Sequence, residues 1–391
     1  MAPRPRASEV RSFGSIGPLG SVAALALALA TLALGGACRQ SVILDSVVDA
    51  GDPGGPAGLG GTTGMNDAGA AGDMRGGMTG GGHFDGGRPD GFGFCFGGQI
   101  QYIPITMRSP YVIASVDRSA DMQMSFSATA TRLEVVQQQV QALTTKYPVV
   151  KWGYQEFPST MGMCGSGQGC CAGDVVPPGY NSGKSIRSAI HACDAGGVGC
   201  KQAQRPIADA LSKCYDAFKV VYNQDEPNDH RYVLLLTSGD PTCLSSPMST
   251  TTPCADAVTA VMKLSNTFSN TAVFAIGDTA VASTCLDMVA SFGGLDGHAA
   301  KTPNDLSAEL DTFVESKAEE ACTIDVHSPP ADPRSVALLF DGAPVPYDGN
   351  DGWTFDQNSN LSLTIHGSFC RTLVQSNVSV HLVGGCMPPH N

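Results

Sequence analysis

Basic residues are scarce in this sequence. Its 391 residues include 23 Lys and Arg against 36 Asp and Glu, which gives a formal net charge of −13. A chain with this balance is repelled by nucleic acid and by anionic lipid surfaces, because both are negatively charged. The composition therefore excludes DNA and RNA as partners, and it says nothing about the fold.

Recognisable catalytic motifs are also missing. The sequence has no Gly-x-Ser-x-Gly, no His-Glu-x-x-His and no complete phosphate-binding loop. Gly183-Lys184-Ser185 lacks the strand-ending glycine that such a loop places before it. The histidines are scattered and fit surface or packing positions. We therefore expect a protein that is not an enzyme.

No apolar run is long enough to span a bilayer comfortably, which takes about 20 residues. The longest covers residues 22–34, follows Arg4, Arg6 and Arg11, and ends at the small residues 35–37. A basic start, a short apolar core and small residues after it are typical of a secretory signal. Residues 1–37 are therefore predicted to be a signal peptide.

Cys38 follows this segment directly, in a pattern that resembles a lipoprotein box. We expect lipidation at Cys38, which would anchor the mature chain in the outer membrane or at the cell surface. Ordinary cleavage after Ala37 is the alternative, since Gly35 and Ala37 also suit the general signal peptidase. Both interpretations predict export.

Fourteen cysteines are too many for a reducing cytosol unless metal sites explain them. Zinc sites need paired short spacings, and the one close cluster, Cys164, Cys170 and Cys171, has no histidine beside it. Disulfides are the better interpretation. If Cys38 carries lipid, thirteen cysteines remain, so at least one thiol is unpaired or bonds another chain.

The chain divides by composition into four segments. After the signal, residues 38–98 are rich in Gly and poor in large apolar residues, which predicts a flexible tether. Residues 99–321 alternate short apolar runs with helical patterns. Residues 322–391 contain short strand-like runs separated by turn residues such as Asp341-Gly342, which predicts a small β-rich appendage.

The alternation in residues 99–321 predicts an α/β fold with a doubly wound, mostly parallel sheet. The expected strands lie at 111–116, 149–154, 232–236 and 272–276, and the expected helices at 131–143, 206–221, 255–264, 286–292 and 305–320. The Gly-rich insertion 161–204 carries five cysteines, so we expect bridges to hold it.

Two strand ends carry the candidate site. Asp117, Ser119 and Asp121 follow the first strand, and Ser238 and Asp240 follow the strand at 232–236. Open α/β sheets bind ligands at such carboxyl ends. These loops resemble the metal-ion-dependent adhesion site of von Willebrand factor A (VWA) domains, and the order of strands and helices over roughly residues 105–321 is similar to that family. The Cys-bearing insertion and the C-terminal β segment resemble its bacterial, myxobacterium-type members.

The differences from the family's pattern matter most. The resemblance places Asp121 where the family has Ser, Arg205 where it has a metal-binding Thr, and Ser238 where it has Asp. The guanidinium of Arg205 cannot ligate a metal and would repel one. We expect it to face Asp117 and Asp121 in place of the ion, which makes the metal site degenerate and the chain free of a cofactor.

The alternative interpretation keeps the ion. If Arg205 points away, then Asp117, Ser119 and Asp121, together with Ser238 and Asp240, supply oxygens for Mg²⁺ or Ca²⁺. In either case the resemblance implies recognition of a protein or glycan ligand at the cell surface. A structural envelope component without a discrete ligand site is the second hypothesis about function.

Three disulfides are predicted from position in the sequence. Cys95 and Cys322 flank the α/β domain, whose two ends are expected to be close together. Cys243 and Cys254 flank a short loop after a central strand, and Cys370 and Cys386 flank the last β segment.

Overall fold

The structure is a computed structural model. It describes residues 101–385 except 160–169, 192, 194–199, 201, 222–229, 245–249, 268, 331 and 357–359. By internal contacts the chain divides into two units at His83 and Phe84, and all the described residues belong to the second. The expected signal peptide, Cys38 and the Gly-rich segment, as well as Cys95 and Cys386, lie outside the described residues.

A six-stranded sheet forms the centre of the unit, and its strand order is β5-β4-β3-β6-β7-β8. All neighbouring pairs are parallel except β4 and β5. The strands are β3 (Tyr111–Asp117), β4 (Lys151–Phe157), β5 (Val176–Gly179), β6 (Arg231–Thr237), β7 (Ser269–Ile276) and β8 (Gly294–Ala300). Counted along the chain this is the order 3-2-1-4-5-6 of a doubly wound sheet, which confirms the predicted fold class.

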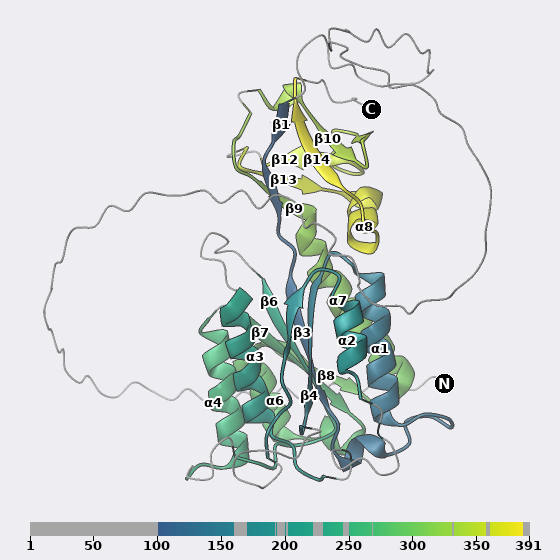
Figure 1. Ribbon diagram of the computed structural model, residues 1–391, viewed down its shortest axis with the longest axis vertical. Helices are drawn as coiled ribbons and strands as arrows, with labels where there is room; N and C mark the ends of the chain where they lie inside the picture. The colour runs from purple at the N-terminus through teal and green to yellow at the C-terminus, as the bar shows by residue number, and fades with distance from the viewer. Residues whose placement is uncertain are drawn as a thin grey trace, which may run out of the picture. The chain divides into compact units, whose positions relative to one another are not determined.

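Helices cover both faces of this sheet, as Figure 1 shows. Along β6, Val233 and Leu235 enter one core, whereas Leu234 and Leu236 enter the other. This alternation is why residues 233–236 of the strand are all apolar. The helices α1 (Arg132–Lys146), α2 (Gly183–Ala189) and α7 (Pro303–Ala318) pack on one face, and α3 (Ile207–Val221), α4 (Pro253–Ser265) and α6 (Thr284–Phe292) pack on the other.

Two four-stranded antiparallel sheets form the β-rich appendage, in the orders β1-β14-β10-β11 and β12-β13-β9-β2. A short 3₁₀ segment, η3 (Glu319–Cys322), connects α7 to it. Its other elements are β9 (Thr323–Val326), β10 (Val336–Phe340), β11 (Ala343–Val345), β12 (Trp353–Phe355), β13 (Ser362–Ile365), α8 (Gly367–Gln375) and β14 (Val380–Gly384). Trp353 is fully buried there.

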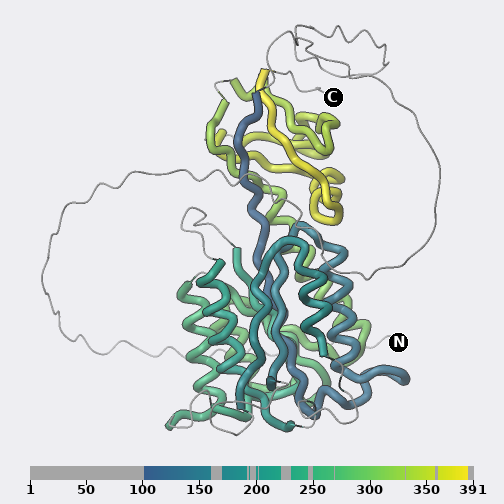
Figure 2. The backbone as a smooth tube through the Cα atoms, viewed as in Figure 1, coloured from purple at the N-terminus to yellow at the C-terminus, as the bar shows by residue number. Residues whose placement is uncertain are grey.

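The first two strands of the chain also belong to this appendage. β1 (Gln101–Ile103) pairs with β14, and β2 (Ile105–Met107) pairs with β9. Figure 2 shows the backbone passing from these strands into β3. Residues 101–107, placed by composition in the segment 99–321, therefore complete the sheets of the segment 322–391.

The disulfide pairing differs from every predicted pair. Cys322 is bonded to Cys370. The predicted pairs Cys95–Cys322 and Cys370–Cys386 are therefore both wrong. The reason is α8, a helix that the sequence analysis missed, which brings Cys370 against η3.

The predicted Cys243–Cys254 pair is also wrong. Cys254 begins α4 and is bonded to Cys285 at the start of α6, because these two helices pack side by side. Cys243 is bonded to Cys170 of the insertion. The packing of α4 against α6 therefore decides the partner of Cys254, and the short loop between Cys243 and Cys254 does not.

One buried thiol stays free among the described residues. Cys214 lies on the inner side of α3, and burial raises the pKa of its thiol to about 12. None of the helices in the described part of the chain is long and apolar enough to cross a membrane.

Candidate functional site

The carboxyl ends of β3 and β6 lie side by side at the centre of the sheet. β3 is followed by α1 on one face, and β6 is followed by α4 on the other. Between two such strands the direction of winding reverses, and doubly wound proteins bind ligands there. Both loops chosen from the sequence therefore lie at the expected position.

Asp117, the last residue of β3, is fully buried and hydrogen-bonded on both oxygens. The Ser119 amide donates to Oδ1 at 2.7 Å. Oδ2 accepts from the Thr237 hydroxyl at 3.0 Å, from the Ser238 amide at 3.0 Å and from the Ser238 hydroxyl at 2.9 Å. The carboxylate is thus used to join the ends of β3 and β6.

Arg205 approaches the same loops from the segment before α3. Its Nη1 donates to Asp121 Oδ2 at 2.6 Å, and its Nε donates to the Asp240 carbonyl at 2.8 Å. A Cβ on Gly239 would stand 3.2 Å from the guanidinium carbon, so the glycine lets this group lie close against the loop. The structure places Arg205 opposite Asp121, whereas the contacts of Asp117 are with hydroxyl and amide donors.

Asp240 and Ser119 complete the predicted set. The Asp240 carboxylate accepts a hydrogen bond from Ser283, so it is turned toward the start of α6. The Ser119 hydroxyl is buried and has no hydrogen-bond partner among the described residues. Of the five predicted residues, Ser119 is therefore the one whose side-chain oxygen has no hydrogen-bond partner among the described residues.

The residues present do not fit a divalent ion. An ion needs several free oxygens, but Asp117 Oδ2 accepts from three donors and Asp121 is paired with a permanent cation. Within the described ranges, no group of three His, Cys, Asp or Glu residues is arranged to hold a metal. The geometry instead suits a site whose charge is balanced by a guanidinium.

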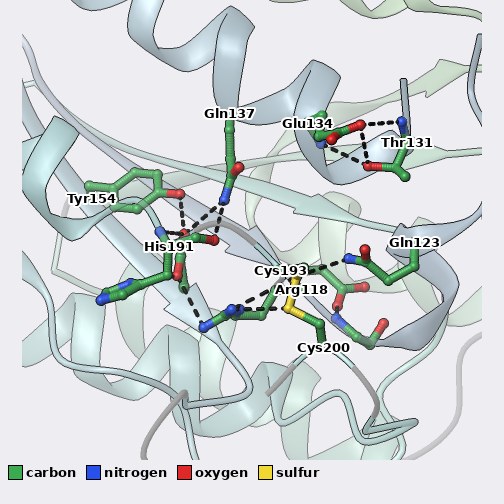
Figure 3. Close-up of a disulfide and its surroundings, with 12 residues drawn as sticks. Arg118, Gln123, Thr131, Glu134, Gln137, Tyr154, His191, Cys193 and Cys200 are labelled. Atoms are coloured by element: carbon green, nitrogen blue, oxygen red, sulfur yellow. Dashed lines mark hydrogen bonds and ion pairs between the residues drawn. A yellow bond between two sulfur atoms is a disulfide. The ribbon is translucent and has the colours of Figure 1, made fainter. Parts of the chain in front are cut away.

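A second charged cluster lies beside this site, and the sequence analysis missed it. Arg118 and Glu156 are both buried, and Arg118 Nη1 lies 3.4 Å from Glu156 Oε2. Glu156 also accepts from Gln137 at 3.0 Å and from the Tyr154 hydroxyl at 2.8 Å, as Figure 3 shows for the labelled partners. The signal was available, since Gln155-Glu156 interrupts an otherwise apolar strand just before its end.

This cluster keeps its tyrosine neutral. Burial, with the neighbouring Glu156 carboxylate as the next cause, raises the pKa of Tyr154 well above its ordinary value. The phenol therefore stays protonated and serves as a donor. His191 Nδ1 lies 3.1 Å from Glu156 Oε2, and both residues line a cavity of about 420 Å³ whose wall also includes Lys213.

The same cluster contacts a disulfide of the insertion. Cys193 and Cys200 are bonded, and Arg118 Nη2 lies 3.0 Å from Cys200 Sγ and 3.8 Å from Cys193 Sγ. The Gln123 side-chain amide lies 3.1 Å from Cys193 Sγ. The insertion is thus held by bridges, as its composition predicted: Cys193–Cys200 lies within it, and Cys170–Cys243 joins it to the loop after β6.

No protein-family model matches the sequence, and no curated protein matches it. Solved structures with a similar fold include BatB from Bacteroides thetaiotaomicron, at 15% identity over 54% of this chain and 100% of that one, with a TM-score of 0.37. The SpRpn10 VWA domain is 14% identical over 52% of this chain and 95% of its own, with a TM-score of 0.36.

The manganese-loaded TRAP protein of Plasmodium vivax is 12% identical over 55% of this chain and 76% of its own, with a TM-score of 0.35. These identities and TM-scores are low, so the fold class rests on the strand order of the chain itself. That order is the doubly wound, mostly parallel α/β arrangement expected of a VWA-like chain.

Proposed function

We propose that this chain is an exported, lipid-anchored protein that recognises a protein or glycan ligand through the loops at the carboxyl ends of β3 and β6. In this proposal the guanidinium of Arg205 takes the place of a divalent ion, and no cofactor is needed. The chain carries out no catalysis of its own.

One observation carries the proposal, namely the ion pair between Arg205 and Asp121. The two atoms are 2.6 Å apart, and the Asp121 side chain is 52% exposed while that of Arg205 is 12% exposed. The pair therefore lies at the rim of the site, where a partner can reach it. Among the described residues, Nε and Nη1 of the guanidinium have acceptors and Nη2 has none, so Nη2 can donate to a ligand oxygen.

The export part of the proposal rests on the cysteines. Four disulfides join described cysteines, and disulfides persist in oxidising compartments outside the cytosol. Lipidation at Cys38 is tested by fractionation of cells that express the protein. A Cys38→Ser chain should move from the membrane fraction to the soluble fraction, and unchanged membrane association would contradict the anchor.

A second candidate function is a structural envelope component without a ligand site. The burial of Asp117 favours it, because a carboxylate sealed by hydroxyl and amide donors joins strands and presents nothing to a partner. The exposed rim at Asp121 favours recognition instead. The variant Arg205→Ala distinguishes recognition from a structural role. If the site recognises a ligand, this variant should lose partner binding while the protein keeps its melting temperature.

Calorimetry of the purified protein with Mg²⁺, Ca²⁺ and Mn²⁺ tests the metal-free site. We expect no binding by the unaltered chain. The double variant Arg205→Thr/Ser238→Asp should create divalent binding, because it removes the cation and supplies the missing carboxylate. Ser238→Asp alone is the matched control, since it keeps Arg205. Strong metal binding by the unaltered chain would reject the proposal.

A further inference from the structure

The Cys193–Cys200 bridge differs from the other described bridges in having a buried cation against its sulfurs. The side chain of Arg118 is 3% exposed, and its Nη2 lies 3.0 Å from Cys200 Sγ. Its Nε and Nη1 have no hydrogen-bond partner among the described residues. The buried guanidinium therefore has N–H groups that donate no hydrogen bond to a described residue, although buried donors normally have an acceptor.

The neighbouring carboxylate does not use these donors. Glu156 lies near Arg118, but its oxygens accept from Gln137, Tyr154 and the His191 amide. Arg118 Nη1 makes no hydrogen bond to it despite the 3.4 Å separation. A further anion next to Arg118 would therefore gain donors that are unused when the bridge is closed.

A thiolate at Cys200 is such an anion. An adjacent arginine lowers the pKa of a thiol, and a thiol with a lower pKa leaves faster in thiol–disulfide exchange. Cys200 is buried, whereas Cys193 is partly exposed and its nearest other donor is the neutral amide of Gln123. One sulfur is thus the better leaving group and the other is the more accessible. Figure 3 shows Arg118 and Gln123 beside the disulfide.

We propose that Cys193–Cys200 is an exchangeable disulfide, in which an incoming thiol bonds to Cys193 and Arg118 stabilises the Cys200 thiolate that leaves. The reductant is a dithiol. Its thiolate forms a bond with Cys193 Sγ, the Cys193–Cys200 bond breaks, and the electron pair remains on Cys200 Sγ.

The second thiol of the reductant then completes the reaction. It bonds to the first sulfur of the reductant and displaces Cys193 as a thiolate. The protein disulfide gains two electrons and the dithiol becomes a disulfide. Of the two protons that the dithiol releases, Cys193 takes one and solvent takes the other, so Cys200 stays ionised beside Arg118.

The bridge is coupled to the ligand-recognition loops. Cys200 and Arg205 lie in one short segment, and the Gln202 carbonyl in this segment accepts from the Ala120 amide at 2.9 Å. Ala120 belongs to the loop that also carries Asp121. Exchange at Cys193 therefore breaks the covalent bond between Cys193 and the segment that carries Cys200 and Arg205, and re-oxidation forms it again.

The rate of reduction tests the proposal. The unaltered protein is treated with dilute dithiothreitol, quenched with acid, and mapped by differential alkylation and mass spectrometry. We expect Cys193–Cys200 to open at least about tenfold faster than Cys254–Cys285 and Cys322–Cys370, because only its leaving thiolate is stabilised. Equal rates at the three bridges would overturn the proposal.

Two variants assign the effect to the guanidinium. Arg118→Met should reduce the rate advantage to less than about threefold, because the leaving thiolate loses its cation. Arg132→Met is the matched control, since Arg132 donates to the Asp121 carbonyl in the same region and does not contact the sulfurs. An undiminished rate in a folded Arg118→Met protein contradicts the role of Arg118.

A second measurement needs no variant. Brief treatment of the unaltered protein with glutathione, followed by acid quenching, should leave the glutathione on Cys193. Glutathione found mainly on Cys200, or equally on both cysteines, would reject the assignment of the attacked sulfur. This outcome is independent of ligand recognition, and it remains decisive if Arg118→Met fails to fold.

Discussion

At the scale of single residues, Asp117 joins the two central strands through donors from Ser119, Thr237 and Ser238. Asp117→Ala leaves these buried donors without an acceptor, and we expect the free energy of unfolding to fall by about 3 kcal/mol. Urea denaturation followed by circular dichroism measures this. Asp174→Ala is the control and should change little, because Asp174 is exposed. An equally small loss at Asp117 would mean that the buried contacts are not needed.

His230 makes the stability depend on pH. Its Nδ1 lies 2.9 Å from Glu320 Oε2, and this hydrogen bond raises the pKa of His230 above its ordinary 6.5, against the opposing effects of burial and of Arg108 and Lys317. A raised pKa in the folded state stabilises the protein below pH 6.5, and the contribution is lost as the pH rises through the folded-state pKa. His230→Asn should therefore cost more stability at pH 5.5 than at pH 8.5 in urea denaturation.

The control for this prediction is His381→Asn, since His381 lies outside the His230–Glu320 contact and should show no such difference between the two pH values. A His230→Asn penalty that is constant with pH would show that the histidine acts through packing alone.

Residue positions could be predicted at this site, and most contacts between side chains could not. Asp117, Asp121 and Ser238 were chosen because they follow apolar runs, and the ends of such runs meet at one edge of a parallel sheet. The direction of a side chain within a loop has no periodicity. The family resemblance predicted Arg205 opposite both Asp117 and Asp121, but nothing in the sequence indicated that Arg205 meets Asp121 and not Asp117, or that Arg118 turns toward Glu156 and the disulfide.

At the scale of elements, α1 begins with a capping box next to the site. The Thr131 hydroxyl accepts from the Glu134 amide at 3.2 Å, and the Glu134 carboxylate accepts from the Thr131 amide at 2.7 Å. We expect Thr131→Ala to lower the free energy of unfolding by about 1 kcal/mol, because the first turn loses its acceptor. Thr145→Ala near the other end of the helix is the control and should cost less, since its hydroxyl bonds only within the helix. Chemical denaturation of the unaltered protein, Thr131→Ala and Thr145→Ala measures the three free energies of unfolding.

Long elements with a clear apolar period were predicted well. Elements that are short, or that lack an apolar run, were missed. The pattern of α3 is unmistakable because its apolar residues repeat at helical spacing over fifteen positions. β8 is Gly-rich and mostly exposed, so it shows no apolar run, and β1 and β2 have three residues each. These short strands are defined by their partners, which lie more than two hundred residues away in the sequence.

At the scale of the whole unit, one bridge between described cysteines joins the end of the α/β domain to the appendage. Cys322 ends η3 and Cys370 lies in α8, 48 positions further along the sequence. Replacing both with alanine should lower stability by about 4 kcal/mol, from the chain-entropy estimate for a loop of this length. Thermal unfolding measures the loss, and the Cys254→Ala/Cys285→Ala protein is the comparison, since its 31-position loop should cost slightly less. An unchanged melting temperature would mean that packing alone holds the appendage.

The presence of disulfides was easier to predict than their pairing. An odd cysteine was expected on the premise that Cys38 is lipidated, and Cys214 is the free thiol among the described residues. The pairing depends on which helices pack together, and the three predicted pairs assumed that cysteines close to the same loop or boundary would meet. The packing of α4 against α6 and of α8 against η3 decided otherwise.

The path of the chain through β1, β2 and β3 has a mechanical consequence. β1 and β2 lead directly into β3, and β3 ends at Asp117 with β4 and β6 paired along its two edges. Tension between residues before Gln101 and a partner held at Asp121 would run along this extended segment and load β3 in shear against both neighbours. β1 and β2 lie on the same line of force and are paired with β14 and β9, so the appendage sheets and the central strand would bear the pull together.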